Sequence, residues 1–427
     1  MVKVLLVILC VGEFSDTFLI DIWLSFRTSH VGTECEVRSL TRVSLKNTDY
    51  VKPNHCKLPD ALICIDGSTV INAGAWRTKR RAELLHLFET EVYGRSTGRP
   101  KNEWFEITQT DRHFLEDAAT LKEITVHFNR GTDSRQMHLV LLVPKGSSKR
   151  PVFLGTEDWH WPKSTILGRG YALAYMKNVR EIEEDENPEG WKRGIRGFYL
   201  QQAGKTEFAE DEWGAIGVWA WALSRAMDYL VTDKEIDARR VAVMGHSRWG
   251  KAALWAGAQD ERFAMVVSNE SGSGGAALAR SNFEQKPYPR DVGIRDTDSS
   301  HLHWFCGNYK QYVDRVYDLP VDQHELLALI APRPLYIASA EEDQYMNPLS
   351  EFLAAKYADP VYRLFGLVGL GVKEMPPVIT PVGDFIRYHV RTGRHGLTDY
   401  DWQQYLRFAD CHFGIKPKPC SASPSNN

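Results

Sequence analysis

The sequence predicts an α/β fold in which a mostly parallel central sheet is sandwiched by helices. Short apolar runs typical of buried strands recur along the chain, and amphipathic stretches with helical spacing lie between the later ones. The early runs follow one another as in hairpins, whereas the later ones alternate with helices. Such alternation is typical of parallel sheets that are covered on both faces.

An amphipathic helix is predicted first, over residues 77–93, because Leu84, Phe88 and Val92 share one face. Two more helices are predicted, over residues 213–231 and 248–259. The apolar runs predicted as strands are residues 121–128, 137–143, 151–154, 171–176, 240–244, 265–267 and 334–338.

The chain is expected to divide into three parts: residues 1–57, 58–415 and 416–427. In the first part, Lys3 precedes an apolar run over residues 4–11 that is typical of a short secretory signal. This run is too short to span a membrane. We therefore expect a secreted or periplasmic protein with a signal segment and an irregular arm, one α/β-hydrolase catalytic domain, and a disordered tail.

Charge and cysteine content narrow the function classes. The 52 basic and 55 acidic residues nearly cancel, so neither nucleic acid nor a membrane surface is an expected partner. Without Cys10 of the signal segment, six cysteines remain, an even number that suits disulfides, although unpaired buried thiols are the alternative. Their spacings match no zinc pattern, so no zinc site is expected there. We also expect no other metal, no cofactor and a monomer.

The segment Gly-His-Ser-Arg-Trp-Gly at residues 245–250 lies between a predicted strand and a predicted helix. α/β-Hydrolases place the nucleophilic serine at such a turn, which makes Ser247 the candidate. The second glycine comes one position later than in the G-x-S-x-G pattern, at Gly250. The alternative is that Ser247 only caps the following helix.

Two cations follow this serine. Arg248 comes next to it and can reinforce an oxyanion site, and Lys251 lies about one helical turn beyond it, on the same side. The alternative is that both are solvated charges on a helix face. Residues 159–161, Trp-His-Trp, follow a predicted strand and form either a cleft wall or simple packing.

The base and the acid are expected after the serine, in the order serine, acid, histidine. His395, between Gly393 and Gly396, is the favoured base, and His389 is the alternative. Both are expected to follow the last strand. His246 adjoins the serine, but we expect its ring to pack elsewhere around the turn.

Two acids are plausible. Glu270 follows the strand over residues 265–267, 23 residues after Ser247 (270 − 247). Asp343 follows the strand over residues 334–338, where most α/β-hydrolases keep their acid.

The segment Gly-His-Ser-Arg-Trp-Gly-Lys at residues 245–251 resembles the G-C-S-R-x-G-K signature of glucuronoyl esterases, carbohydrate esterase family 15, in the form with His for Cys found in bacterial members. The likeness continues at residues 268–275, 303–306, 322–334 and 388–395, and covers most of residues 58–415. It implies an α/β-hydrolase that cleaves esters of glucuronic acid, notably those that link glucuronoxylan to lignin alcohols.

The resemblance also implies residue roles. Ser247 matches the nucleophile, Arg248 the arginine that stabilises the oxyanion, Lys251 the lysine that contacts sugar hydroxyls, and His395 the catalytic histidine.

For the acid and the sugar site, the resemblance implies the following. Either Glu270 or Asp343 can serve as the acid; we expect both to contact the base, and Glu270 to be the partner if only one acts. Tyr345, Gln285 and Trp304 are expected to bind substrate. Tyr345 stands where a tryptophan is common, and Gln285 ends a loop segment in which bacterial members carry a glutamate.

We therefore expect a serine esterase that acts on (4-O-methyl-)glucuronate esters through an acyl-enzyme. One alternative is a carbohydrate acetyl esterase of the same fold, against which Lys251 beside Arg248 argues. Another is a non-catalytic carbohydrate-binding relative, against which the presence of serine, histidine and both acids argues.

Overall fold

The computed structural model describes residues 5–9, 21–25, 58–130, 133–183, 187, 189–280, 301–313 and 315–415. The chain divides into two compact units, one formed by residues 1–54 and 283–285 and the other by residues 55–282 and 286–427. In the first unit, β1 (Leu5–Leu9) pairs antiparallel with β2 (Asp21–Ser25) within the segment expected to be an irregular arm. The expected tail, residues 416–427, lies outside the described residues, and the division into three parts stays a prediction.

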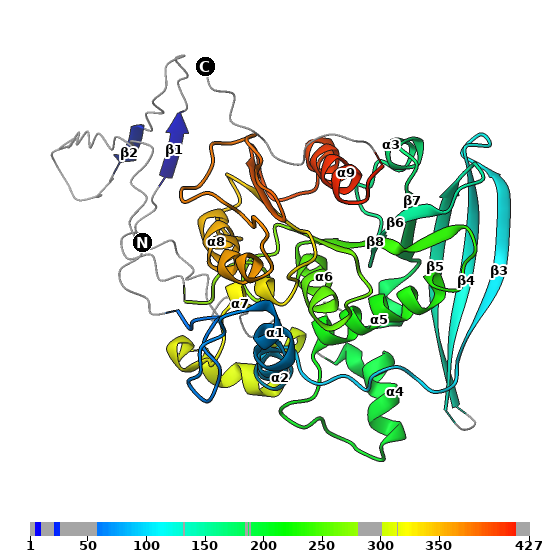
Figure 1. The fold of residues 1–427 in the computed structure, drawn as a ribbon, viewed down its shortest axis with the longest axis horizontal. Helices are drawn as coiled ribbons and strands as arrows, with labels where there is room; N and C mark the ends of the chain where they lie inside the picture. Colours follow the sequence, from blue (N-terminus) through cyan, green and yellow to red (C-terminus); the bar gives the residue numbers. More distant parts are fainter. Residues whose placement is uncertain are drawn as a thin grey trace, which may run out of the picture. The chain divides into compact units, whose positions relative to one another are not determined.

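The second unit contains the sheet that carries the candidate site. Its strands are β3 (Glu103–Phe114), β4 (Ala119–Arg130), β5 (Asp133–Pro144), β6 (Arg150–Gly155), β7 (Ala172–Met176), β8 (Ile236–His246), β9 (Met265–Asn269), β10 (Leu335–Ala340), β11 (Val382–Gly383) and β12 (Ile386–Arg391). Within the described residues they form one ten-stranded sheet in the order β11-β12-β10-β9-β8-β6-β7-β5-β4-β3 (Figure 1). The centre, from β7 to β12, is parallel. Both edges pair antiparallel.

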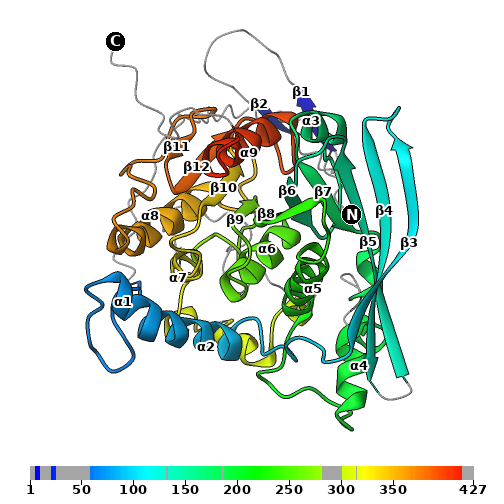
Figure 2. The ribbon, with the colours of Figure 1, turned by 45° about the vertical axis from the view of Figure 1, so that its right-hand side comes forward.

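Helices cover both faces of the sheet (Figure 2). One face packs on α3 (Lys163–Gly168) and α9 (Asp399–His412), in a buried cluster that includes Met265, Val267 and Trp402. The intervening Val266 points the other way, towards Gly257 of α6. The remaining helices are α1 (Ala73–Ala75), α2 (Arg81–Glu91), α4 (Ile195–Gln202), α5 (Ala215–Leu230), α6 (Arg248–Gln259), α7 (Gln323–Ala328) and α8 (Pro348–Leu364).

Short helical turns complete the fold. A π-helical turn, η1 (Trp76–Arg80), joins α1 to α2. The 3₁₀ turns are η2 (Val179–Glu181), η3 (Gly190–Lys192), η5 (Leu302–Trp304), η6 (Gly307–Tyr312) and η7 (Val316–Asp318). Among the described helices, none has both the length and the apolar content that a membrane span requires.

The predicted fold class is confirmed, and each predicted strand corresponds to one of β4 to β10. The predicted helices correspond to α2, α5 and α6, and the bounds of α6 agree with the prediction at both ends. Three strands of this sheet were missed, and one of them, β11, has only two residues. β3 is an edge strand with mostly exposed residues, and β12 carries two arginines and a histidine, so neither has an apolar run.

Two cysteines differ from the expected disulfides. Cys64 and Cys306 are unpaired and buried. Burial raises the pKa of the Cys306 thiol to about 12, so it stays protonated at neutral pH. At these two positions the alternative of buried thiols is correct.

Candidate active site

The turn between β8 and α6 has the strained geometry of a nucleophile elbow. Ser247 has φ 57° and ψ −126°, a conformation that residues with a Cβ rarely adopt. Its backbone N–H donates to the carbonyl of Asn269, at 2.9 Å. A Cβ on Gly245 would lie 2.1 Å from the carbonyl oxygen of Trp249, so the turn requires glycine there. The structure therefore confirms the predicted turn.

Gly250 explains why the second glycine comes late. A Cβ at this position would lie 3.0 Å from Ser268 Oγ and 3.0 Å from Ser271 Cβ. The first turn of α6 thus packs tightly against the end of β9 and the segment after it.

The side chain of Ser247 makes no capping hydrogen bond to α6, so the capping interpretation is wrong. Arg248 is the first residue of this twelve-residue helix. Backbone N–H groups in a first helical turn lack intrahelical acceptors, and the helix dipole adds positive potential there. A substrate oxyanion beside Ser247 would therefore lie in a favourable field.

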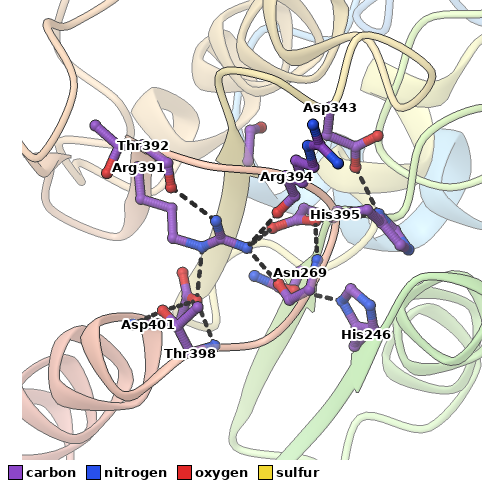
Figure 3. A network of polar contacts seen from close by, with 12 residues as sticks. His246, Asn269, Asp343, Arg391, Thr392, Arg394, His395, Thr398 and Asp401 are labelled. Carbon is purple, nitrogen blue, oxygen red and sulfur yellow. Dashed lines mark hydrogen bonds and ion pairs between the residues drawn. The ribbon is translucent and has the colours of Figure 1, made fainter.

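The structure brings the predicted base and both predicted acids together, and Figure 3 shows Asp343 in contact with His395. Nδ1 of His395 lies 2.5 Å from Oδ2 of Asp343 and 3.1 Å from Oε2 of Glu270. Glu270 directly follows β9, Asp343 follows β10 and His395 follows β12. These strands are neighbours and run parallel, so their carboxyl ends meet at one edge of the sheet.

The two carboxylates change the protonation of the base. Burial lowers the pKa of His395, but the hydrogen bonds and charges of Asp343 and Glu270 outweigh burial and raise it to about 9. Burial raises the pKa of Glu270 to about 7, against the hydrogen bond from His395 and the charge of Arg391. Both carboxylates therefore favour the imidazolium form of His395.

Glu270 makes further hydrogen bonds besides its contact with the base. Its Oε1 accepts from Arg391 at 2.6 Å, and its Oε2 accepts from the N–H of Gly396 at 2.8 Å. It is fully buried and has φ 46°, so the surrounding contacts hold it in a strained conformation. Both acids contact the base, as expected, and Asp343 is the closer of the two.

Arg391 is a site residue that the sequence analysis missed. It is buried, and it bridges Glu270 and Asp401 and also donates to the carbonyls of Arg394 and Gly396. Figure 3 shows its contacts with Asp401 and Arg394. These contacts fix the loop that carries the base. The signal in the sequence was partial: Arg391 lies beside the segment with Gly393 and Gly396 that carries His395, but the strand that it ends was not predicted.

His389 is not the base. It was expected to follow the last strand, but it lies inside β12 and is fully buried. Its ring nitrogens contact Tyr336 Oη at 2.8 Å and Asp401 Oδ1 at 2.9 Å.

The expectation for His246 is wrong. Its ring does not pack away from the base: the ring centroids of His246 and His395 lie 4.4 Å apart. Its Nδ1 lies 2.6 Å from Oδ1 of Asn269, and its ring also stacks against Trp159, at 5.3 Å. Trp159 is 46% exposed, which favours the cleft-wall interpretation of this segment.

Arg248 lies between two indole rings. Its guanidinium carbon is 5.4 Å from the ring centre of Trp249 and 5.9 Å from that of Trp304. Such cation–π contacts hold a guanidinium in place. Trp304, an expected substrate residue, is thus in contact with the predicted oxyanion arginine.

Lys251 is buried and not a solvated surface charge. Its ammonium group donates to the carbonyl of Ser271 and, at 2.8 Å, to that of Ser273. Burial lowers the pKa of Lys251 to about 8, against the charge of the buried Glu351. Lys251 therefore holds the segment that follows Glu270, which the sequence analysis did not predict.

The other expected substrate residues differ in placement. Tyr345 follows Asp343 by two positions in the chain and is 47% exposed, so its ring is accessible. Gln285 lies outside the described residues.

Within the described part of the chain, one group of side chains has the spacing of metal ligands. One ligand atom each of His246, Glu270 and His395 lies within 4.8 Å of the others. The carboxylate of Glu270 already accepts from Arg391, Gly396 and His395, so a cation would have to displace these donors. The same arrangement serves a histidine base without change.

Comparisons with known proteins point the same way as the geometry. A family model described as "Glucuronyl esterase, fungi" matches residues 126–366. "Carbohydrate esterase MZ0003", from an unknown prokaryotic organism, is 37% identical over 408 residues, which are 86% of this chain and 92% of that protein. The 4-O-methyl-glucuronoyl methylesterase 1 of Wolfiporia cocos is 29% identical over 332 residues. The match covers 74% of this chain and 73% of that protein. The solved structure of a glucuronoyl esterase from Solibacter usitatus is 42% identical, with a TM-score of 0.78, and covers 85% of this chain and 100% of its own.

Proposed function

The chain belongs to the glucuronoyl esterase family, carbohydrate esterase family 15, and we propose that Ser247 and His395 hydrolyse (4-O-methyl-)glucuronate esters of the kind that link glucuronoxylan to lignin. The enzyme is a carboxylic ester hydrolase. The observation that carries the proposal is the contact of His395 Nδ1 with two carboxylates. The His395 ring also lies against the ring of His246, the residue before the strained Ser247. This is the arrangement that a histidine base needs to activate a serine.

In the acylation step, Oγ of Ser247 attacks the ester carbonyl and its proton passes to Nε2 of His395. The carboxylates at Nδ1 stabilise the imidazolium that forms. The oxyanion is stabilised by the N–H and guanidinium of Arg248 at the start of α6. When the carbon–oxygen bond of the ester breaks, His395 returns the proton to the departing alcohol, which leaves a glucuronoyl ester on Ser247.

The second step releases the sugar acid. His395 is neutral again and takes a proton from water, which attacks the acyl-enzyme carbonyl. The bond to Ser247 Oγ then breaks and His395 protonates this oxygen, so glucuronic acid leaves and the enzyme is restored.

We propose that Lys251, Tyr345 and Trp304 recognise the sugar. An ammonium group has three donors, and carbonyls of the segment after Glu270 accept two from Lys251. The third would donate to a sugar hydroxyl. The exposed ring of Tyr345 offers an apolar face for the pyranose.

Assays on two kinds of ester test the proposal against its rivals. The purified chain should hydrolyse the benzyl esters of glucuronic and 4-O-methylglucuronic acid, and leave acetylated xylan unchanged. Deacetylation of xylan without glucuronate hydrolysis would identify a carbohydrate acetyl esterase. Binding of glucuronoxylan with no hydrolysis of either ester would identify a non-catalytic relative.

The proposed substrate also supports the expected location. A plant cell-wall polymer cannot enter a cell, so an enzyme that acts on it works outside the cytoplasm. We therefore propose that the protein is secreted or periplasmic. We also propose that it acts as a monomer.

A further inference from the structure

We propose that His246 is a positioning residue for the catalytic base, and that its flat ring fixes the plane of the His395 imidazole. This inference rests on the proposed serine esterase function. It concerns a residue that precedes the nucleophile and takes no part in the proton transfers described above.

The ring of His246 is itself rigidly held. Its Nδ1 lies 2.6 Å from Oδ1 of Asn269, and Nδ2 of Asn269 donates to Oη of Tyr405 at 2.8 Å. His246 is 7% exposed, and Asn269 and Tyr405 are fully buried. Because Oδ1 can only accept, the hydrogen lies on Nδ1 of His246. The indole of Trp159 packs against the same ring, so two neighbours, Asn269 and Trp159, determine its orientation.

His395 needs such a support. It lies in a loop with Gly393 and Gly396, and its side chain is 36% exposed. Its hydrogen-bonded contacts to carboxylates both involve Nδ1, and contacts at one ring atom leave the ring able to swing about that atom. The ring of His246 lies 4.4 Å away at an interplanar angle of 37°, and it limits this motion.

Asn269 couples the support to the nucleophile. Its backbone carbonyl accepts the N–H of Ser247 at 2.9 Å, its side chain holds His246, and the next residue is the acid Glu270. Two consecutive residues therefore serve the site. Asn269 binds the backbone of the nucleophile and the ring of His246, and Glu270 is one of the acids. A displacement of about 1 Å in such an arrangement can cost roughly a hundredfold in rate.

The charge of His246 suits this position. Burial and the charge of His395 lower its pKa to about 4, although Asn269, Asp401 and Asp343 act in the opposite direction. The ring is therefore neutral at neutral pH, and it does not repel the imidazolium that forms on His395 during acylation. A permanent cation at this position would oppose that charge.

Two substitutions of similar size separate ring support from simple filling of space. His246→Phe keeps a flat ring, whereas His246→Leu fills the site without one, and both lose the hydrogen bond to Asn269. For each variant, the experiment measures kcat and KM on benzyl glucuronate, the melting temperature, and the rate at which a fluorophosphonate labels Ser247. The Phe variant should exceed the Leu variant at least about tenfold in kcat and in labelling rate, with similar KM and melting temperature.

Equal rates for the two variants at equal melting temperature would overturn the inference, and so would a Leu variant within about twofold of wild type. The labelling reaction needs no glucuronate, so it decides the inference even if the enzyme prefers another ester. If a fluorophosphonate labels wild-type Ser247 but glucuronate esters are not cleaved, only the proposed substrate fails. If wild-type Ser247 is not labelled at all, the proposed nucleophile and this inference fail together.

Discussion

Nδ1 of His395 lies 2.5 Å from Oδ2 of Asp343, although 52 residues separate the two along the chain. Oε2 of Glu270, which follows the neighbouring strand β9, lies 3.1 Å from the same nitrogen. The base therefore has two carboxylates for a task that one can perform, and their shares can be separated by mutation.

Asp343→Asn and Glu270→Gln should each lower kcat by about tenfold to a hundredfold, because the remaining carboxylate still orients His395. The double variant should fall nearly as far as His395→Ala, since groups that act as a unit are not additive. Glu342→Gln removes an exposed acid beside Asp343 and serves as the control. If one single variant matches His395→Ala and the other has no effect, the acids do not share the task.

The pH dependence of kcat/KM reports the same contact. Only neutral His395 can accept the serine proton, so activity rises as the pH increases through its pKa. The two carboxylates raise that pKa to about 9, and the Asp343→Asn change removes one of them. The acidic limb of the profile should therefore move to lower pH in this variant. The profile is measured with benzyl glucuronate and corrected for spontaneous hydrolysis. An acidic limb at the same pH in the variant and the wild type would contradict the pKa assignment.

Arg391 offers a test of how the acid loop is held. Arg391→Met leaves the buried carboxylates of Glu270 and Asp401 without their shared cation. Removal of one partner of a buried ion pair typically costs about 3–5 kcal/mol. The free energy of unfolding in urea should drop by that order. As the control, Arg394→Met changes a side chain that is 91% exposed and should leave the free energy of unfolding nearly unchanged. If the two variants lose the same free energy of unfolding, Arg391 does not stabilise this loop.

Lys251→Met should reduce kcat/KM for benzyl glucuronate more than for a small aryl acetate, because only the glucuronate has sugar hydroxyls to accept from the ammonium group. Some loss on both esters is expected, since Lys251 also holds the carbonyls of Ser271 and Ser273. Parallel kinetics on the two esters measure the difference. Losses of the same size would mean that Lys251 acts through this segment alone.

The sequence predicted the sheet centre and the nucleophile turn well, for physical reasons. Strands β4 to β10 are apolar because they are buried between helix layers, and local pattern reports burial. The turn at Ser247 needs glycine at Gly245 because the backbone of Trp249 lies so close, and such a constraint is visible in sequence. Strand order then placed Glu270, Asp343 and His395 at one edge.

The missed features depend on pairing between distant segments. β12 was not predicted because Arg391 and His389 are charged or polar, yet both are buried against Asp401 from α9. No local pattern reveals that partner. The position of the His246 ring beside His395 likewise follows from the turn and from a loop about 150 residues away.

The proposed mechanism depends on Ser247 as the nucleophile, and the Ser247→Ala variant tests this role most directly. The variant retains the fold, so its melting temperature should match that of the wild type, while kcat on benzyl glucuronate falls by about three or more orders of magnitude. Activity within about tenfold of the wild-type value would contradict the assignment of Ser247 and the mechanism built on it.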